Sequence, residues 1–461
     1  RDAGLLGKAA LGFSGGIEGP GHSFDRGDRE REELLREALA ELGEEQPELQ
    51  LALLSRLLLE LSFDASARGA EERRQRMEEA RKLATELPDQ SKSLEFLLRQ
   101  LESLGPKTTP PGDRLHEADN LIRLAHETGD FDTELKARVL RTFALWEGTD
   151  TSAAAEEIAR SRRLADEQLP NVGALWRVRV MERAMMLFAG RFDEVERALD
   201  EDARGIETKL DPLVAKRRSM HQRVVFALDA GDPAALVEPV EQLVQQLKSE
   251  ELTWLEIEEA ELDQLAFQWW PTWRANQALV LAAAGRHGPA GDVLESLGRN
   301  DFEDILPHEY WLQAIAVIGM AVARNYAENP MRAKAERLFA LLRPYAERAI
   351  VPGSVVMNWG SVSTVLGMLA AQLENWEEAA SLLRAGIEQS ELMKSPPAVI
   401  RSQLELALLH QRRSQRETDG AVHRDRAADL AEQVRDRAGQ LGMTPVKERA
   451  REILVWAQNV D

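Results

Sequence analysis

The chain contains no cysteine, so disulfides, thiolate nucleophiles and cysteine-ligated zinc sites are all excluded. Aromatic residues are scarce, at 5% of the sequence with three tyrosines. No run approaches the roughly 18 consecutive apolar residues of a membrane-spanning helix, and no signal peptide is visible at the start. We therefore predict a cytoplasmic protein, and we interpret the start at Arg1 rather than Met as the beginning of a piece of a longer chain.

Positive charge is in short supply, because 58 Lys and Arg residues face 79 Asp and Glu residues and the formal net charge is −21. Such a field repels polyanions, so we expect neither nucleic acid nor an anionic membrane as a direct partner. With 461 residues, 44% of them hydrophobic, the chain can bury a large core. Leu, Ala, Glu and Arg dominate the composition, and these residues favour helix over sheet.

The sequence also lacks the residue patterns of known catalytic and metal sites. None of the eight histidines has a glutamate three positions before it, as the Glu-x-x-His pairs of di-iron bundles require, and no His-Glu-x-x-His zinc motif occurs. Carboxylate pairs are plentiful, but a chain this acidic is expected to carry them on solvated helix faces. We predict no catalytic residue, no metal and no cofactor. The histidines are His22, His116, His126, His221, His287, His308, His410 and His423.

One stretch, residues 16–23, differs by a single residue from the phosphate-binding pattern G-x-x-x-x-G-K-[ST]. His22 occupies the lysine position, and Glu18 would place a negative charge among the phosphates. The residues before it, Leu5 to Leu11, have helical rather than strand character, whereas a phosphate loop follows a buried strand. We therefore interpret the match as accidental, and residues 1–27 as a glycine-rich linker that leads into a helical array.

From about residue 28 onward, apolar residues recur at helical spacing and are punctuated by turn-forming residues. The clearest unit runs from Leu366 to Ile387, with the spacing L-G-x-x-A-x5-W-x-x-A-x3-L-x-x-G-I. It resembles the tetratricopeptide pattern, in which small residues let two antiparallel helices approach each other. Glu374 departs from that pattern, which usually has glycine at this turn.

Comparable turns recur along the chain at intervals of 41 to 54 residues, longer than the roughly 34 residues of a regular tetratricopeptide repeat. These turns are at Gly148, Gly190, Gly231, Gly285, Asn329 and Asn375. We predict an all-α fold, in which tetratricopeptide-like helical hairpins form a right-handed superhelical solenoid over residues 28–461. Within it we expect an acidic helical insert near 247–270, a flexible loop near 411–425 and a terminal helix over 444–458.

Aromatic and arginine side chains on the first helix of several pairs are the candidates for ligand or partner binding, because that helix lines the inner surface of such arrays. Their aromatic faces and guanidinium groups are suited to the wall of a groove. The alternative is that these rings fill the junctions between helix pairs, which is the commoner role of aromatic residues. The candidates are Trp176, Arg179, Arg183, Trp269, Trp270, Trp273, Arg274, Tyr310 and Trp311.

The order of several short segments resembles one family, the tetratricopeptide-rich C-terminal region of multidomain signal-transduction ATPases of the STAND class. The segments are Gly15-Gly16 followed by Glu33 to Leu39, Gly190-Arg191-Phe192, Trp273-Arg274-Ala275, Asp301-Phe302, and Gly360-Ser361-Val362 with Leu366-Gly367. The resemblance implies a sensor arm that binds an inducer or a partner protein. It also implies an ATPase domain upstream, linked to a transcriptional activator or a nucleotidyl cyclase, so ATP would bind only there. The insert near 247–270 departs from the family.

Two other hypotheses remain open at this point. In the first, the chain is a free-standing helical scaffold that holds two proteins together. In the second, it is an enzyme that uses acidic residues of the run from Leu255 to Asp263. An amphipathic acidic helix explains that run without chemistry. We therefore expect a non-catalytic binding and regulatory array.

Overall fold

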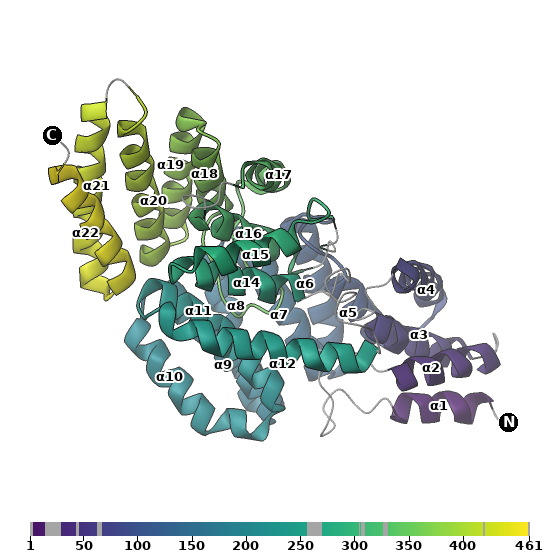
Figure 1. Ribbon diagram of the computed structural model, residues 1–461. Helices are drawn as coiled ribbons and strands as arrows, with labels where there is room; N and C mark the ends of the chain where they lie inside the picture. The colour runs from purple at the N-terminus through teal and green to yellow at the C-terminus, as the bar shows by residue number, and fades with distance from the viewer. Residues whose placement is uncertain are drawn as a thin grey trace.

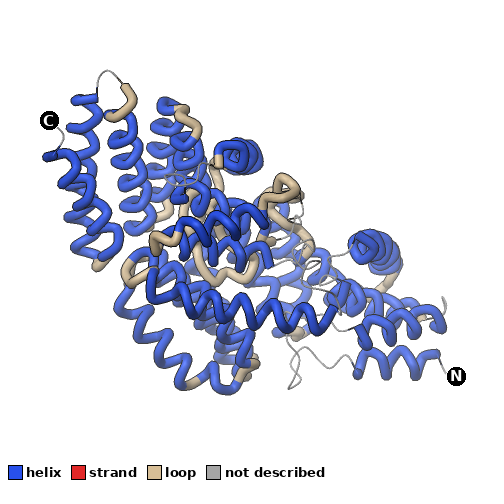
Figure 2. The backbone as a smooth tube through the Cα atoms, in the orientation of Figure 1, coloured by secondary structure: helices blue, strands red, loops and turns tan. Residues whose placement is uncertain are grey.

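The computed structural model describes residues 3–13, 29–42, 46–61, 67–255, 270–303, 305, 309–325, 331–417 and 420–459. Throughout these residues the regular elements are helices (Figure 2), and strand-like pairing is limited to one bridge between Ala349 and Ser361. The predicted all-α fold class is therefore confirmed. Of the described helices, none has the length and apolar character that a membrane crossing needs.

Five helices form the N-terminal end of the array (Figure 1). They are α1 (Ala3–Phe13), α2 (Arg29–Leu42), α3 (Pro47–Leu61), α4 (Ala67–Glu86) and α5 (Leu94–Glu102). Within the predicted linker segment 1–27, α1 agrees with the helical character of Leu5 to Leu11. This apolar helix buries Ala10 completely in a cluster with Leu35 of α2 and Leu53 of α3. The phosphate-loop-like stretch at 16–23 lies outside the described residues.

The middle of the chain continues as antiparallel neighbours joined mostly by short turns, as helical hairpins are. The helices are α6 (Pro111–Thr128), α7 (Phe131–Glu147), α8 (Thr151–Gln168), α9 (Val172–Phe188), α10 (Phe192–Arg204), α11 (Pro212–Asp229) and α12 (Val237–Leu255). The predicted turns at Gly148, Gly190 and Gly231 each fall between two helices of this series. Gly190 has a φ of 77°, a left-handed conformation that glycine adopts without steric cost.

The C-terminal half repeats the same arrangement (Figure 1). It contains α14 (Trp270–Ala283), α15 (His287–Leu297), α16 (Trp311–Asn325), α17 (Arg332–Leu342), α18 (Val362–Gln372), α19 (Trp376–Leu392), α20 (Pro396–Ser414), α21 (Gly420–Leu441) and α22 (Thr444–Asn459). The predicted turns at Gly285 and Asn375 fall between helices, and Asn329 lies outside the described residues. Helix α22 is the terminal helix expected over 444–458.

Two other segment predictions have a different outcome. Helix α20 continues to Ser414 and α21 begins at Gly420, so the flexible loop expected over 411–425 is wrong for most of its length. Its basic residues find partners, since Arg413 donates to Glu377 (2.7 Å) and Glu417 (2.9 Å). Of the expected insert, residues 247–255 complete α12 and Trp270 begins α14, while 256–269 lie outside the described residues.

The helical array agrees with the predicted solenoid, but distant repeats also contact one another, in addition to the contacts between neighbours that a solenoid has. Ser395, just before α20, donates a 2.7 Å hydrogen bond to the carbonyl oxygen of Phe188 at the end of α9, 207 positions earlier. The turn at Gly190 lies so close to Pro397 that an added Cβ would be 3.1 Å from its ring. The end of α9 thus contacts the start of α20.

Candidate functional site

The predicted ligand wall is part of the hydrophobic core. Trp176, Trp270, Trp273 and Trp311 expose 4%, 4%, 1% and 2% of their surface, and all four belong to one buried cluster. Trp269 lies outside the described residues. The rings therefore fill junctions between helix pairs, as the packing alternative holds, and they are not spread along an accessible inner surface.

Arg179 and Arg183 are held by carboxylates of the following hairpin. Nε of Arg179 donates to Oδ1 of Asp202 at 2.6 Å, and Arg183 pairs with the other oxygen of the same carboxylate. Burial lowers the pKa of the Arg183 guanidinium, and the charges of Asp202 and Glu207 oppose that shift. The two arginines thus hold α9 against α10, since a buried charge needs a partner of this kind.

The remaining candidates are also committed to contacts within the fold. Nη1 of Arg274 donates to Gln277 at 2.7 Å, with its guanidinium 5.9 Å from the Trp270 ring. Tyr310 is half-buried just before α16. Trp311 packs edge-on against Tyr345, with ring centroids 5.4 Å apart.

A buried segment, residues 349–361, was not predicted from the sequence, and we call it the inner loop. It connects η4, the 3-10 turn over Arg343–Tyr345, to α18, and it runs between the two halves of the chain. Ile350, Val351, Val355 and Met357 are completely buried. Val351 and Val355 join the cluster that contains residues of α7 to α9, and Ile350 and Met357 join the cluster that extends from α9 to α22.

A buried loop must satisfy its backbone polar groups within the protein. The N–H of Ala349 donates to the carbonyl oxygen of Glu147 at the end of α7 (2.9 Å), and Ile350 and Trp359 donate to Gly360 and Ile350 within the loop (2.8 and 2.9 Å). The side-chain amide of Gln222 on α11 donates to Val356 O at 2.9 Å. The inner loop is therefore anchored from both halves of the array.

Charged side chains secure the two ends of the inner loop. Arg348 donates to the buried carboxylate of Glu147 (2.8 Å) and to the carbonyl oxygen of Pro106 (2.9 Å), in the connection between α5 and α6. At the other end Arg401 donates to Trp359 O (3.1 Å) and pairs with Asp229 of α11. These contacts join residues up to 242 positions apart, so the inner loop links repeats that are not adjacent along the chain.

One residue of the inner loop has a strained backbone. Val355 has a φ of 54°, an outlier for a β-branched residue, and its N–H donates to Pro352 O at 2.9 Å. Such strain persists only where the surrounding structure over-determines the conformation. The packing and hydrogen bonds around the inner loop supply that constraint.

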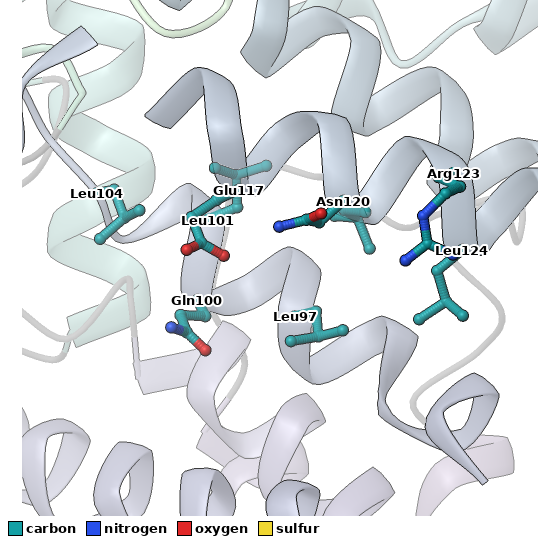
Figure 3. A pocket seen from close by; sticks show the side chains of 9 residues that line it. Leu97, Gln100, Leu101, Leu104, Glu117, Asn120, Arg123 and Leu124 are labelled. Carbon is teal, nitrogen blue, oxygen red and sulfur yellow. The ribbon is translucent and has the colours of Figure 1, made fainter. Parts of the chain in front are cut away.

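In the part of the chain that the structure describes, an open cleft lies between α5 and α6 (Figure 3). Its volume is about 340 Å³. The residues around it are Leu97, Gln100, Leu101, Leu104, Glu117, Asn120, Leu121, Arg123 and Leu124. None of them was singled out from the sequence, although the leucines at 97, 101 and 104 follow helical spacing and provided a signal.

Comparison with known proteins does not extend this description. No protein-family model matches the chain, and no curated protein has a significantly similar sequence.

Proposed function

We propose that the chain is a non-catalytic sensor and protein-interaction array. It binds an inducer or a partner protein and regulates an upstream ATPase domain, which is linked to a transcriptional or cyclase output. The resemblance to the STAND class motivates this proposal. The proposal includes a cytoplasmic location for the chain. A protein of charge −21 does not bind nucleic acid directly in this role.

One structural observation carries the proposal: the inner loop connects α7, α11 and α20, which lie far apart in the sequence. In a solenoid, small changes at each junction add up along the array. Here a change at one repeat also acts directly on distant repeats through the inner loop. Regulation further requires that the ligand bind one arrangement of the array better than another, because equal affinity for both shifts no population.

The first test is to read the gene upstream of the codon for Arg1. An open frame that runs back through an intact G-x-x-x-x-G-K-[ST] loop supports regulation of an ATPase. A start codon within a few residues of Arg1 contradicts it and favours the alternative, a free-standing helical-repeat scaffold.

The second test measures ATP turnover by the full protein. Gln222→Leu removes an anchor of the inner loop, and Gln242→Leu is a matched change of an exposed amide on α12. We expect turnover to change in the first variant and not in the second. Equal turnover in the wild type and both variants would contradict coupling through the inner loop.

A further inference from the structure

The cleft between α5 and α6 has the size and walls of a small-molecule site. Five leucines line it: Leu97 and Leu101 on α5, Leu104 just after it, and Leu121 and Leu124 on α6. Its volume of about 340 Å³ lies at the lower end of the roughly 300–1,000 Å³ found for ligand pockets. A protein interface needs a far larger contact area, of about 800 Å² per partner.

Three hydrogen-bond acceptors at this cleft are uncommitted within the described residues. The carboxylate of Glu117 and the side-chain amide of Gln100 have no hydrogen-bond or ion-pair partner there. The amide nitrogen of Asn120 donates to Nε2 of His116 at 3.2 Å, which leaves the Asn120 carbonyl oxygen available. Glu117 and Gln100 lie toward one end of the cleft, with Asn120 near its middle (Figure 3).

The one cation of the cleft wall is already neutralised. Nη1 of Arg123 pairs with both carboxylate oxygens of Glu127, at 3.0 and 3.1 Å. In Figure 3 Arg123 lies beside Leu124, away from Glu117 and Gln100. The unbalanced charge that a ligand meets is therefore the negative charge of Glu117, and an anionic ligand would be repelled by it.

We propose that this cleft binds a small amphiphilic cation, with an aliphatic body against the leucines and a primary ammonium group at Glu117. An ammonium group carries three N–H donors and no acceptor, so it can pair with the carboxylate of Glu117. Glu117 is exposed, so the attraction is moderate and weakens as salt is added. The assignment rests on the proposed function, since it names a ligand class for a binding array.

The position of the cleft gives binding a route to the inner loop. The connection that follows α5 carries Pro106, whose carbonyl oxygen accepts the hydrogen bond from Arg348 at 2.9 Å. It also carries Lys107, whose ammonium lies 5.2 Å from the centre of the Trp311 ring. A ligand that shifts α5 against α6 therefore displaces contacts at the end of the inner loop and at α16.

The experiment titrates the 461-residue chain with n-hexylammonium, n-hexanol and n-hexanoate, by calorimetry or ligand-observed NMR. Hexylammonium should bind with one site per chain, and about threefold to fivefold more tightly than hexanol, which is the contribution of an exposed ion pair. Hexanoate should bind more weakly than hexanol. Equal affinities for hexylammonium and hexanoate, or no binding of hexylammonium, would overturn the proposal.

Three variants locate the binding. Glu117→Gln should reduce the affinity for hexylammonium to that for hexanol, and Leu97→Trp, at a half-buried position of the wall, should fill the cleft and abolish binding. Glu156→Gln removes an exposed carboxylate on α8 and should change nothing, so it is the matched control. Unchanged affinity in Glu117→Gln would overturn the proposal, provided that its helical circular dichroism equals that of the wild type. Such a failure leaves the regulatory role intact, because that role is measured by ATP turnover and not by binding of this probe.

Discussion

The side-chain amide of Gln222 on α11 donates a 2.9 Å hydrogen bond to the carbonyl oxygen of Val356 in the inner loop, 134 positions later in the chain. The same amide nitrogen donates to Val180 O on α9 at 2.7 Å, and the side chain is completely buried. A single residue thus connects two helices and the loop between the halves of the array.

Replacement of this amide tests how much the connection stabilises the fold. Gln222→Leu keeps the size of the side chain but leaves the buried carbonyl of Val356 without its donor, so we expect a loss of about 1 to 2 kcal/mol. Urea unfolding would measure it, with Gln242→Leu as the control, because that amide is exposed and bonds only to Glu238 on its own helix. Equal stabilities of the two variants would contradict an anchoring role for Gln222.

The close approach of α18 and α19 provides a second prediction. A Cβ added at Gly386 would lie 2.3 Å from Oγ1 and 3.0 Å from the backbone nitrogen of Thr364. Gly386→Ala therefore forces the two helices apart, and we expect it to destabilise the protein by about 1 to 3 kcal/mol.

In the control variant for that prediction, Gly439→Ala, we expect a change of stability in the opposite direction. Gly439 is also helical, but an added Cβ there would be 3.7 Å or more from its neighbours. Gly439→Ala should stabilise the protein by up to about 1 kcal/mol, because alanine has the higher helix propensity. Thermal unfolding of both variants would measure the difference, and a stabilising Gly386→Ala would show that the helices are not in close contact.

The sequence predicted the features of the fold that depend on local interactions. Turns at Gly190 and Gly285 were visible because glycine adopts the left-handed conformation found there, with φ of 77° and 74°. The loop over 411–425 was predicted wrongly, because Arg413 is stabilised by Glu377, which lies on another helix and far away in the sequence. The helix propensity of residues 411–425 contains no information about a partner on another helix.

The inner loop and the exposure of the candidate side chains depend on contacts between residues far apart in the sequence. The inner loop has no helical or alternating period, and its burial depends on partners such as Glu147 and Gln222, more than a hundred positions away. The candidate tryptophans were chosen by residue type, but whether a ring is exposed is decided by the helices packed on it. The cleft at Leu97 and Glu117 was not predicted although its leucines follow helical spacing, because an apolar stripe on a helix is ordinarily covered by a neighbour.

The turn before α19 contains a residue that departs from the repeat pattern and is strained. Glu374 has a φ of 61°, whereas glycine occupies the corresponding position in the turns before α10 and α15, at Gly190 and Gly285. Glu374→Gly should therefore stabilise the protein by about 0.5 to 1 kcal/mol. Little is lost with the carboxylate, because its contact with Arg416 is 3.9 Å long and exposed.

The matched control is Glu378→Gly, four positions later in the first turn of α19. There glycine replaces a good helix former in a regular conformation, so we expect a loss of about 1 kcal/mol. Thermal unfolding would compare the two variants. A loss of stability in both would mean that the positive φ of Glu374 carries no strain.

A buried pair of histidines predicts a pH dependence of stability. His410 on α20 and His423 on α21 stack with ring centroids 5.1 Å apart and Nδ1 atoms 2.9 Å apart. Burial, reinforced by His423 and Arg426, lowers the pKa of His410 from 6.5 to about 4. Between these two values the unfolded chain binds a proton that the folded chain does not bind, so stability is complete above about pH 6.5 and decreases as the pH falls.

The expected loss from His410 between pH 7 and pH 5 is about 2 kcal/mol, from the size of the pKa shift. Other groups also titrate in this range, so the measurement compares variants. Urea unfolding of His410→Gln should show a shallower dependence on pH than the wild type, by about that amount, because glutamine takes up no proton. His116→Gln, at an exposed position on α6, should keep the wild-type dependence. Parallel pH curves for the wild type and His410→Gln would mean that His410 titrates equally in the folded and unfolded chains, and that its contact with His423 does not favour the neutral ring.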